Sequence, residues 1–264
     1  MSLSRIGQVR GLVFDIFGTT FDWWTGVTDQ IADLSARKAV QVNAGDMTNR
    51  WREEFFLGLE RVRTGQRDWA PLEVVHAEGL VQVLGDLGLS GTFDDDDHQE
   101  LLRAWHRLPV WSDVAEGLER LRGRFTVCAL SNAGVAQTTD LTKNAGLPFD
   151  CVLSAQIPRH YKPDIEICQL AEELLDLAPE ELMMVAAHGR DLDGARAAGF
   201  RTAYIDRPQE YGPNKGAEDP ARVECDILVR GFDEILVRGF DELADVLGCP
   251  RQPGTGNSGR AATA

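Results

Sequence analysis

From about residue 112 the chain alternates between helix-like and strand-like segments, and this alternation constrains the fold more than any other feature. Amphipathic segments such as VAEGLERLRG and DIEICQLAEELL each precede a short apolar run, RFTVCALS and ELMMVAA respectively. This order is typical of βαβ units, in which parallel strands form a sheet with helices on both faces. We therefore predict an α/β fold, a Rossmann-like doubly wound parallel sheet.

A helical insertion interrupts this pattern after the first strand. The apolar run GLVFDIF, residues 11–17, reads as a buried strand that is closed by Gly18. From about residue 25 to 108 the period becomes helical, and in MTNRWREEFFLGLERVR large apolar residues recur four apart. The predicted organisation is a discontinuous core of residues 1–21 and 109–249, an inserted helical cap of residues 22–108, and a disordered Gly/Pro/Ser-rich tail of residues 250–264.

Charge and composition exclude several kinds of partner. The net charge of −15 argues against nucleic acid and against anionic membranes, which both require a basic face. No apolar run approaches the roughly 18–20 residues of a membrane span, and the N-terminus has no signal-peptide core. The five cysteines are scattered without a C-x-x-C pair, which favours free thiols in a reducing cytoplasm. We expect a cytoplasmic protein with a small-molecule substrate.

Four polar signals stand at the ends of predicted strands. They are Asp15, the Ser131–Asn132 pair, the YKPD turn that contains Lys162, and the HGRD segment that ends at Asp191. The carboxyl ends of parallel strands share one edge of the sheet, and ligands of such folds bind there. The convergence of these residues predicts an enzyme site.

The same motifs carry a family resemblance. D-x-F-G-T, S-N, Y-K-P-D and a late Asp before G-A-R-x-x-G occur in an order that is similar to the haloacid dehalogenase superfamily. Within it the chain most resembles the type II 2-haloacid dehalogenases, over most of residues 8–247. The resemblance implies an inserted helical cap, hydrolysis of a carbon–halogen bond without a cofactor, and a homodimer.

Asp15 is the candidate nucleophile. A carboxylate can form a covalent ester that water later cleaves, provided that a nearby cation keeps it ionised. Lys162 is the candidate cation. Taken alone, Asp15 also reads as an acid that caps a turn and Lys162 as an exposed loop lysine, and their order in the chain favours the catalytic interpretation.

The residue type at position 17 distinguishes phosphoryl transfer from displacement at carbon. Phosphatases of the superfamily carry a second Asp at this position, where it acts as a general acid and helps to hold Mg²⁺. Here Phe17 has no proton to give, and the late motif has Ala187 where another ligand would stand. Asp15 and Asp191 alone make a poor Mg²⁺ site, so we predict displacement at carbon with no metal and no cofactor.

Further roles are implied by the resemblance, one residue at a time. Arg52 in the cap matches the arginine that contacts the substrate and the departing halide, although an amphipathic helix also carries such residues on its surface. Thr19 is expected to donate a hydrogen bond to Asp15. Asp191 matches an acid that pairs with Lys162 and helps to activate water, while its alternative role is a helix N-terminal acid.

Four more positions are candidates for substrate binding, with Phe17 as a wall of the pocket. Ser131 and Asn132 match a pair that binds the substrate carboxylate or orients the nucleophile, and they also suit capping of a strand-end turn. His188 stands close to where better-known members carry an Asn, and it could position water, act as a base or fill the pocket. Trp23 could line an apolar pocket or pack at the hinge between core and cap.

Two other functions remain open at this point. One is a Mg²⁺-dependent phosphatase or phosphonatase, and the other is a ligand-binding protein that has kept the fold without turnover. The DDDD run at residues 94–97 is expected to be a solvated helix start rather than a cation site. The repeated octapeptide ILVRGFDE at residues 227–242 is interpreted as a local duplication in a strand–helix connection.

Overall fold

A parallel sheet forms the centre of the molecule. The structure is a computed structural model that describes residues 7–213, 215–229 and 239–251. Within those residues the sheet has six strands in the order β3-β2-β1-β4-β5-β6, and every pairing is parallel. The strands are β1 (Gly11–Phe14), β2 (Thr126–Ser131), β3 (Cys151–Ser154), β4 (Leu182–Ala186), β5 (Arg201–Ile205) and β6 (Ile227–Val229).

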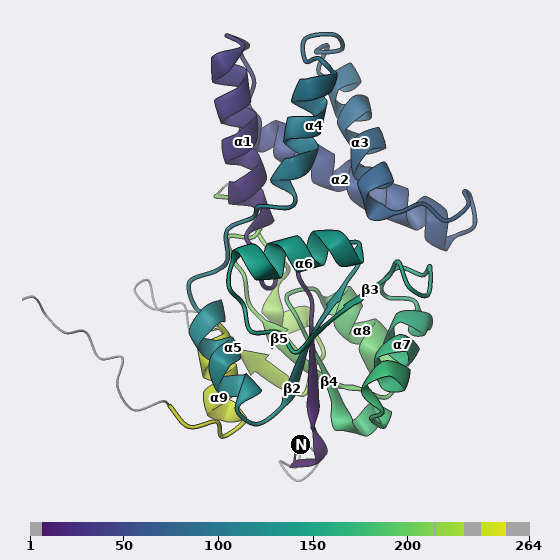
Figure 1. Cartoon of the computed structure of the whole chain (residues 1–264), viewed down its shortest axis with the longest axis vertical. Helices are drawn as coiled ribbons and strands as arrows, with labels where there is room; N and C mark the ends of the chain where they lie inside the picture. The colour runs from purple at the N-terminus through teal and green to yellow at the C-terminus, as the bar shows by residue number, and fades with distance from the viewer. Residues whose placement is uncertain (1–6, 214, 230–238, 252–264) are drawn as a thin grey trace, which may run out of the picture.

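Helices cover both faces of this sheet. In Figure 1 the pair α5 and α9 lies on one side of the strands, and α7 and α8 lie on the other. The bounds are α5 (Val114–Arg122), α6 (Val135–Asn144), α7 (Ile165–Leu175), α8 (Gly189–Ala197) and α9 (Gly239–Val246), with short 3-10 helices η2 (Pro179–Glu181) and η3 (Pro220–Arg222). The predicted doubly wound α/β fold is therefore confirmed.

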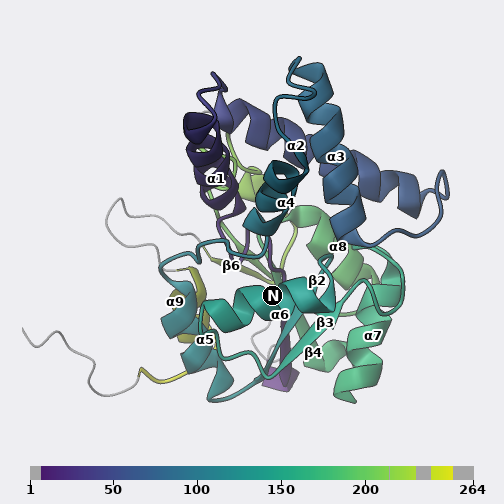
Figure 2. The same ribbon diagram turned by 45° about the horizontal axis from the view of Figure 1, so that its top comes forward.

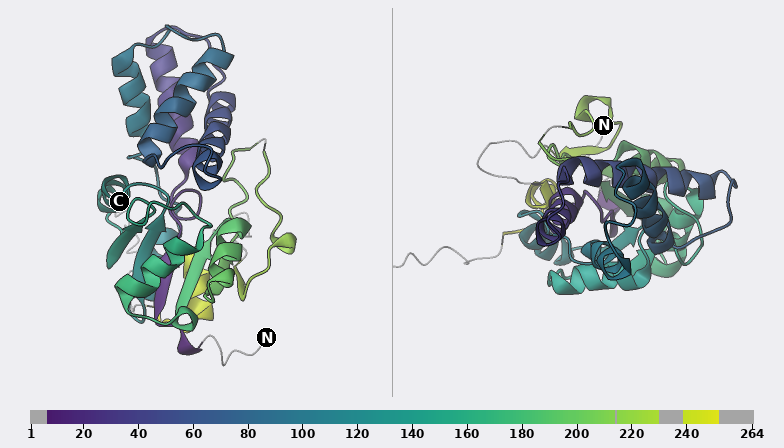
Figure 3. Two further views of the ribbon diagram at one scale, coloured as in Figure 1. Left: turned by 90° about the vertical axis from the view of Figure 1, so that its right-hand side faces the viewer. Right: turned by 90° about the horizontal axis from the view of Figure 1, so that it is seen from above.

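The inserted helices stand together beyond the carboxyl ends of the strands. Figures 1 and 2 show them grouped above the sheet, and the side view in Figure 3 shows the same arrangement. They are α1 (Trp23–Arg37), α2 (Ala44–Arg63), α3 (Leu72–Asp86) and α4 (Asp95–Ala104), all within the predicted cap. The apolar stripe of α2 is buried as its period predicts, because Met47, Trp51, Phe55 and Leu59 pack inward.

The first strand is shorter than its apolar run. It ends at Phe14, whereas the sequence predicted a strand over residues 11–17. The Asp15 N–H still donates to Val185 O at 3.0 Å, but Gly18 then adopts a φ of +90°. Its N–H donates to Phe21 O at 2.8 Å, which turns the chain back on itself. Residues 15–17 are thus buried beyond the end of the strand, and the turn covers residues 18–20.

The acidic run at residues 94–97 starts α4, as predicted. Asp94 accepts a hydrogen bond from Asp97 N at 3.0 Å, and Asp97 Oδ2 accepts one from Asp94 N at 2.9 Å, which together form a capping box. Lys38 contacts Asp97 at 2.6 Å. Asp97 is consequently buried, so the expectation of a solvated run is wrong at that residue.

Several smaller expectations can be compared with the structure. All five cysteines are free. Across the described ranges, no helix combines the length and the apolar character that a membrane span needs. Most of the octapeptide duplication and most of the predicted tail lie outside the described residues.

Candidate active site

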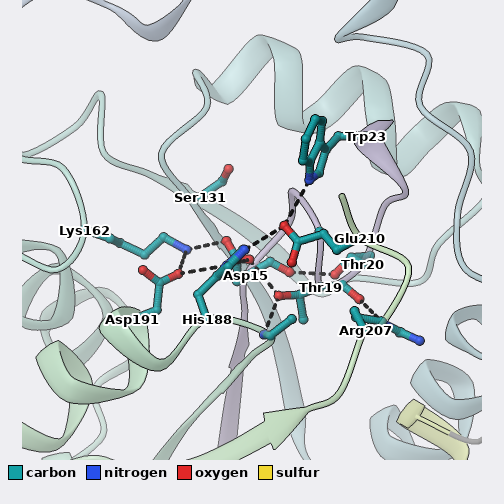
Figure 4. Close-up of polar contacts among 12 residues, drawn as sticks. Asp15, Thr19, Thr20, Trp23, Ser131, Lys162, His188, Asp191, Arg207 and Glu210 are labelled. Atoms are coloured by element: carbon teal, nitrogen blue, oxygen red, sulfur yellow. Dashed lines mark hydrogen bonds and ion pairs between the residues drawn. The ribbon is translucent and has the colours of Figure 1, made fainter. Parts of the chain in front are cut away.

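Asp15 lies directly beyond the carboxyl end of β1, near the middle of the sheet. Its side chain is buried, and Thr19 Oγ1 donates to Asp15 Oδ2 at 2.7 Å (Figure 4). Thr20 Oγ1 donates to the backbone oxygen of Asp15 at 2.6 Å. The segment after β1 therefore holds the side chain of Asp15 through Thr19 and its backbone through Thr20, and Thr19 contacts Asp15 as predicted.

Lys162 brings two carboxylates together. Its Nζ lies 2.7 Å from Asp191 Oδ2 and forms a direct ion pair with Asp15 Oδ1. The amide oxygen of Asn132 accepts from Lys162 N at 2.8 Å, so Asn132 positions the backbone that carries this ammonium group. Asp15 directly follows β1, Lys162 lies in the loop after β3, and Asp191 lies in the first turn of α8 after β4, so all three stand at the carboxyl edge of the sheet.

The charges of this cluster support an ionised Asp15. Burial favours the neutral acid, but Lys162 and His188 together outweigh it and hold the pKa of Asp15 far below its usual range. Burial likewise opposes the charge of Lys162, yet Asp15 and Asp191 raise its pKa. Asp15 is thus a carboxylate and Lys162 an ammonium at neutral pH.

A second acid, which the sequence analysis did not single out, lies beside His188. His188 Nε2 is 2.8 Å from Glu210 Oε1, and His188 Nδ1 is 3.2 Å from Asp15 Oδ2. Trp23 Nε1 donates to the same Glu210 oxygen at 3.0 Å. Glu210 belongs to no motif, and its only signal in the sequence is a position shortly after the last residue of β5.

Arg52 reaches this site from α2 of the cap. Its guanidinium carbon lies 4.4 Å from the ring centre of Phe55, 4.6 Å from Phe56 and 4.9 Å from Trp23. The side chain is buried, and its Nε and Nη1 have no hydrogen-bond acceptor among the described residues. Burial lowers the pKa of Arg52, although the acids near it oppose the shift. An anionic ligand would complete these contacts.

Most of the predicted residues enclose one small cavity. Its volume is about 30 Å³, and it is lined by Asp15, Phe17, Arg52, Phe55, Phe56, Leu59, Asn132, Lys162, His188, Arg190 and Asp191. Phe55, Phe56, Leu59 and Arg190 are lining residues that the sequence analysis did not propose.

Three predicted residues lie outside that lining. Thr19 acts on Asp15 from behind, as described above. Ser131 Oγ accepts from Ala133 N at 3.0 Å, so it caps the turn after β2. Trp23 stacks on Trp105 with ring centres 6.2 Å apart and packs at the base of the cap. Of the alternatives considered for Ser131 and Trp23, turn capping and packing fit the structure.

The donor set does not fit a magnesium ion. Asp15, His188 and Asp191 offer ligand atoms that lie within 4.8 Å of one another. Mg²⁺ prefers six oxygen ligands in octahedral geometry, whereas this cluster has an imidazole and lacks a carboxylate at Phe17. The ammonium of Lys162 already lies between the two acids, so it takes the place of a bound cation in balancing their charge.

Comparison with known proteins agrees with this geometry. A family model described as haloacid dehalogenase-like hydrolase matches residues 9–199. An (S)-2-haloacid dehalogenase of Xanthobacter autotrophicus is 31% identical over 202 residues, which are 76% of this chain and 76% of that protein. An (S)-2-haloacid dehalogenase of Pseudomonas sp. strain CBS-3 is 30% identical and aligns over 77% of this chain and 88% of its own length.

Two solved structures extend the likeness to 90% of the chain. The crystal structure of a defluorinating L-2-haloacid dehalogenase superposes with a TM-score of 0.83 at 35% identity, covering 90% of this chain and 95% of that one. The Xanthobacter autotrophicus enzyme with chloropropionic acid covalently bound superposes with a TM-score of 0.74 at 25% identity, covering 90% and 98%.

The chain therefore belongs to the haloacid dehalogenase-like hydrolase family. The relatives and solved structures named above are 2-haloacid dehalogenases, so the family predicted from the motifs is confirmed, as is the expectation of a hydrolase.

Proposed function

We propose that this protein hydrolyses the carbon–halogen bond of small 2-haloalkanoic acids through an ester on Asp15 and releases 2-hydroxy acids. The observation that carries the proposal is the buried carboxylate of Asp15, paired with Lys162 and facing a cavity that Arg52 also lines. The covalent chloropropionic acid adduct of the Xanthobacter relative supports the same chemistry.

The two oxygens of Asp15 differ in their surroundings. Oδ2 accepts from Thr19 and lies 3.2 Å from His188 Nδ1, whereas the contacts of Oδ1 are with Lys162. Oδ1 is therefore the oxygen that attacks the α-carbon of the substrate in our proposal. The Oδ1–carbon bond forms, the carbon–halogen bond breaks, and the halide leaves with the electron pair. Halide is a stable anion, so Phe17 need not supply a proton.

Arg52 is the anion-binding group of this proposal. Its two unpartnered nitrogens can bind the substrate carboxylate or the departing halide, and the surrounding aromatic rings exclude water. Lys162, another cation of the cavity, is already paired with two acids. Arg52 thus provides the charge that attracts an anionic substrate into a protein of net charge −15.

Ester hydrolysis regenerates the enzyme. Water attacks Cγ of Asp15, one of its protons passes to Asp191, and the acyl–oxygen bond to Oδ1 breaks. The departing oxygen takes a proton and leaves as the hydroxyl of the product. The overall balance is one haloacid and one water converted to one hydroxy acid, one halide and one proton.

The cavity limits the size of the substrate. About 10–15 Å³ of such space holds one water molecule, so a cavity of about 30 Å³ holds only two or three waters and favours the smallest haloacids. Haloacetates and 2-halopropionates are the proposed substrates. The homodimer, the cytoplasmic location and the boundaries of core and cap stay predictions.

Halide release tests this proposal directly. Wild-type protein is expected to release halide from fluoro-, chloro- or bromoacetate and from an enantiomer of 2-chloropropionate, and Asp15→Asn is expected to release none. In ¹⁸O-labelled water, a single turnover places the label in Asp15, which peptide mass spectrometry detects. Unlabelled Asp15 after turnover would contradict the ester.

A metal-dependent phosphatase predicts different results. In the proposed reaction EDTA leaves halide release unchanged, and a generic aryl phosphate is not hydrolysed. Loss of activity in EDTA with recovery on added Mg²⁺ would favour the phosphatase. A chain that binds haloacids without halide release or an adduct would instead be a ligand-binding protein.

A further inference from the structure

Two hydrogen-bond donors converge on one oxygen of Asp15. Thr19 Oγ1 lies 2.7 Å from Oδ2, and His188 Nδ1 lies 3.2 Å from the same atom. Thr19 is itself oriented, because its hydroxyl accepts from Ala187 N at 2.8 Å. In Figure 4 Thr19 lies on the side of Asp15 opposite Lys162. This geometry is that of an oxyanion site, which needs preorganised donors where negative charge develops.

Glu210 is buried and acts on this site through His188. It is 1% exposed, and its Oε1 accepts from Trp23 Nε1 at 3.0 Å and lies 2.8 Å from His188 Nε2. With one ring nitrogen held by Glu210, the other points at Asp15 Oδ2. A buried carboxylate requires such partners, and Glu210 has no place in the reaction sequence described above.

Building on the proposed dehalogenase reaction, we propose that His188 and Thr19 form the oxyanion site for hydrolysis of the Asp15 ester. Glu210 is the positioning residue that orients His188 and provides its counter-charge. The pair is thus assigned to the second half of the reaction, rather than to attack on the carbon–halogen bond.

The charges during the reaction explain why a second acid is useful. Before attack, His188 lies between two carboxylates, Asp15 and Glu210. Ester formation makes Asp15 neutral, and Glu210 is then the nearest carboxylate that keeps the imidazolium protonated, since Asp191 lies at 4.0 Å. When water adds to Cγ, the electrons of the C=Oδ2 bond move to Oδ2, next to the Nδ1–H of His188. They return as the Cγ–Oδ1 bond breaks, so the donors are needed again at each turnover.

His188 is surrounded mainly by acids. The groups that face it are Asp15 beyond β1, Asp191 of α8 at 4.0 Å, and Glu210 with Tyr211 beyond β5. Burial opposes the charged ring, but Glu210 and Asp15 raise the pKa of His188 well above its ordinary value. The ring is therefore an imidazolium at neutral pH, and this agrees with a donor rather than with a general base.

Glu210→Gln separates the two half-reactions in a rapid-quench experiment. The new amide oxygen can still accept a hydrogen bond from Trp23 Nε1, but the substitution removes the negative charge beside His188. The first halide equivalent is expected at a rate close to wild type, and ester hydrolysis is expected to slow about 10²–10³-fold. Halide then appears as a burst of one per site, and intact-mass spectrometry detects the accumulated ester.

Glu218→Gln is the matched control. Glu218 Oε2 accepts from Gly189 N at 2.7 Å and so caps α8 one residue after His188. The substitution makes the same chemical change without altering a contact of the imidazole, and no burst and no adduct are expected. His188→Gln provides a second test that does not depend on the folding of Glu210→Gln, and it should also accumulate the ester.

The pH dependence of ester hydrolysis is a further measurement, because a purely structural role of Glu210 would leave it unchanged. The rate of ester hydrolysis in wild type should fall as pH rises through the pKa of His188. In Glu210→Gln this fall should occur at lower pH. The assignment is overturned if Glu210→Gln slows the burst and ester hydrolysis equally. It is also overturned if the pH dependence does not shift and no ester accumulates. Absence of halide release from wild type would instead overturn the proposed function itself.

Discussion

Gly18 leaves the space that the carboxylate of Glu210 occupies. A Cβ at residue 18 would lie 2.3 Å from Glu210 Oε1, and the φ of Gly18 is +90°. The turn after β1 and the segment after β5 are therefore packed without room for a side chain between them. This contact ties the loop of the proposed nucleophile to the acid that orients His188.

We expect Gly18→Ala to damage both stability and ester hydrolysis. The new methyl group must displace Glu210, and alanine at positive φ costs about 1–2 kcal/mol more than glycine. Thermal unfolding and rapid-quench kinetics measure the two effects. Gly65→Ala is the control, since Gly65 also has a positive φ but has open space around it. A Gly18 variant no worse than this control would contradict the steric argument.

Lys162→Met should abolish most halide release. Without the ammonium, two buried carboxylates lie side by side, the pKa of Asp15 rises, and the nucleophile is partly protonated. We expect at least a hundredfold loss of turnover and a destabilisation of about 3–5 kcal/mol. Halide assays and denaturant unfolding test this, with the exposed Lys143→Met as control. Turnover near that of wild type would argue against the role of Lys162.

The pH dependence of stability should reveal His188. Its pKa is raised in the folded state, so the stability it contributes is complete below its unfolded pKa of about 6.5 and is lost as pH rises through the folded value. The difference in melting temperature between wild type and His188→Gln should therefore shrink at alkaline pH. A difference that grows with pH would mean that the ring is neutral when folded.

Arg207 supports the turn that carries Thr19. Its Nη1 and Nη2 lie 2.7 and 2.9 Å from the carboxylate of Asp113, and its Nε donates to Thr19 O at 3.0 Å. Arg207→Met leaves Asp113 buried without its cation, and we expect a loss of about 3–5 kcal/mol in denaturant unfolding. Arg10→Met, which breaks an exposed pair with Glu181, should cost less than about 1 kcal/mol. Similar losses in both variants would contradict this contrast.

Substrate length should follow the size of the cavity. We expect kcat/KM to fall about tenfold or more for each methylene added beyond 2-chloropropionate. Leu59→Ala removes a lining side chain of α2 and should partly restore activity on the longer acids. Steady-state halide assays with 2-chlorobutyrate and 2-chlorovalerate measure this. Equal kcat/KM for all lengths would mean that the cap opens too widely to select.

Sequence by itself determined the layered fold and the group at its centre. The alternation after residue 112 requires a parallel sheet, and parallel strands bring their carboxyl ends to one edge. Asp15, Lys162 and Asp191 each follow a strand or a strand-end turn, so their meeting follows from topology. The consequence of Phe17 could also be predicted from the sequence, because Phe in place of Asp changes the chemistry of that position and leaves its location in the fold unchanged.

Only the tertiary structure decided which other side chains meet there. Glu210, Trp23 and His188 are far apart in the chain, and no local period indicates that they share one hydrogen-bonded cluster. β1 ends at Phe14, three residues before the apolar run ends, and the turn that follows packs Gly18 against Glu210. Ser131 points to its own turn instead of the cavity. The direction of a side chain depends on how neighbours that are distant in sequence pack around it. The spacing of residues along one chain does not indicate that packing.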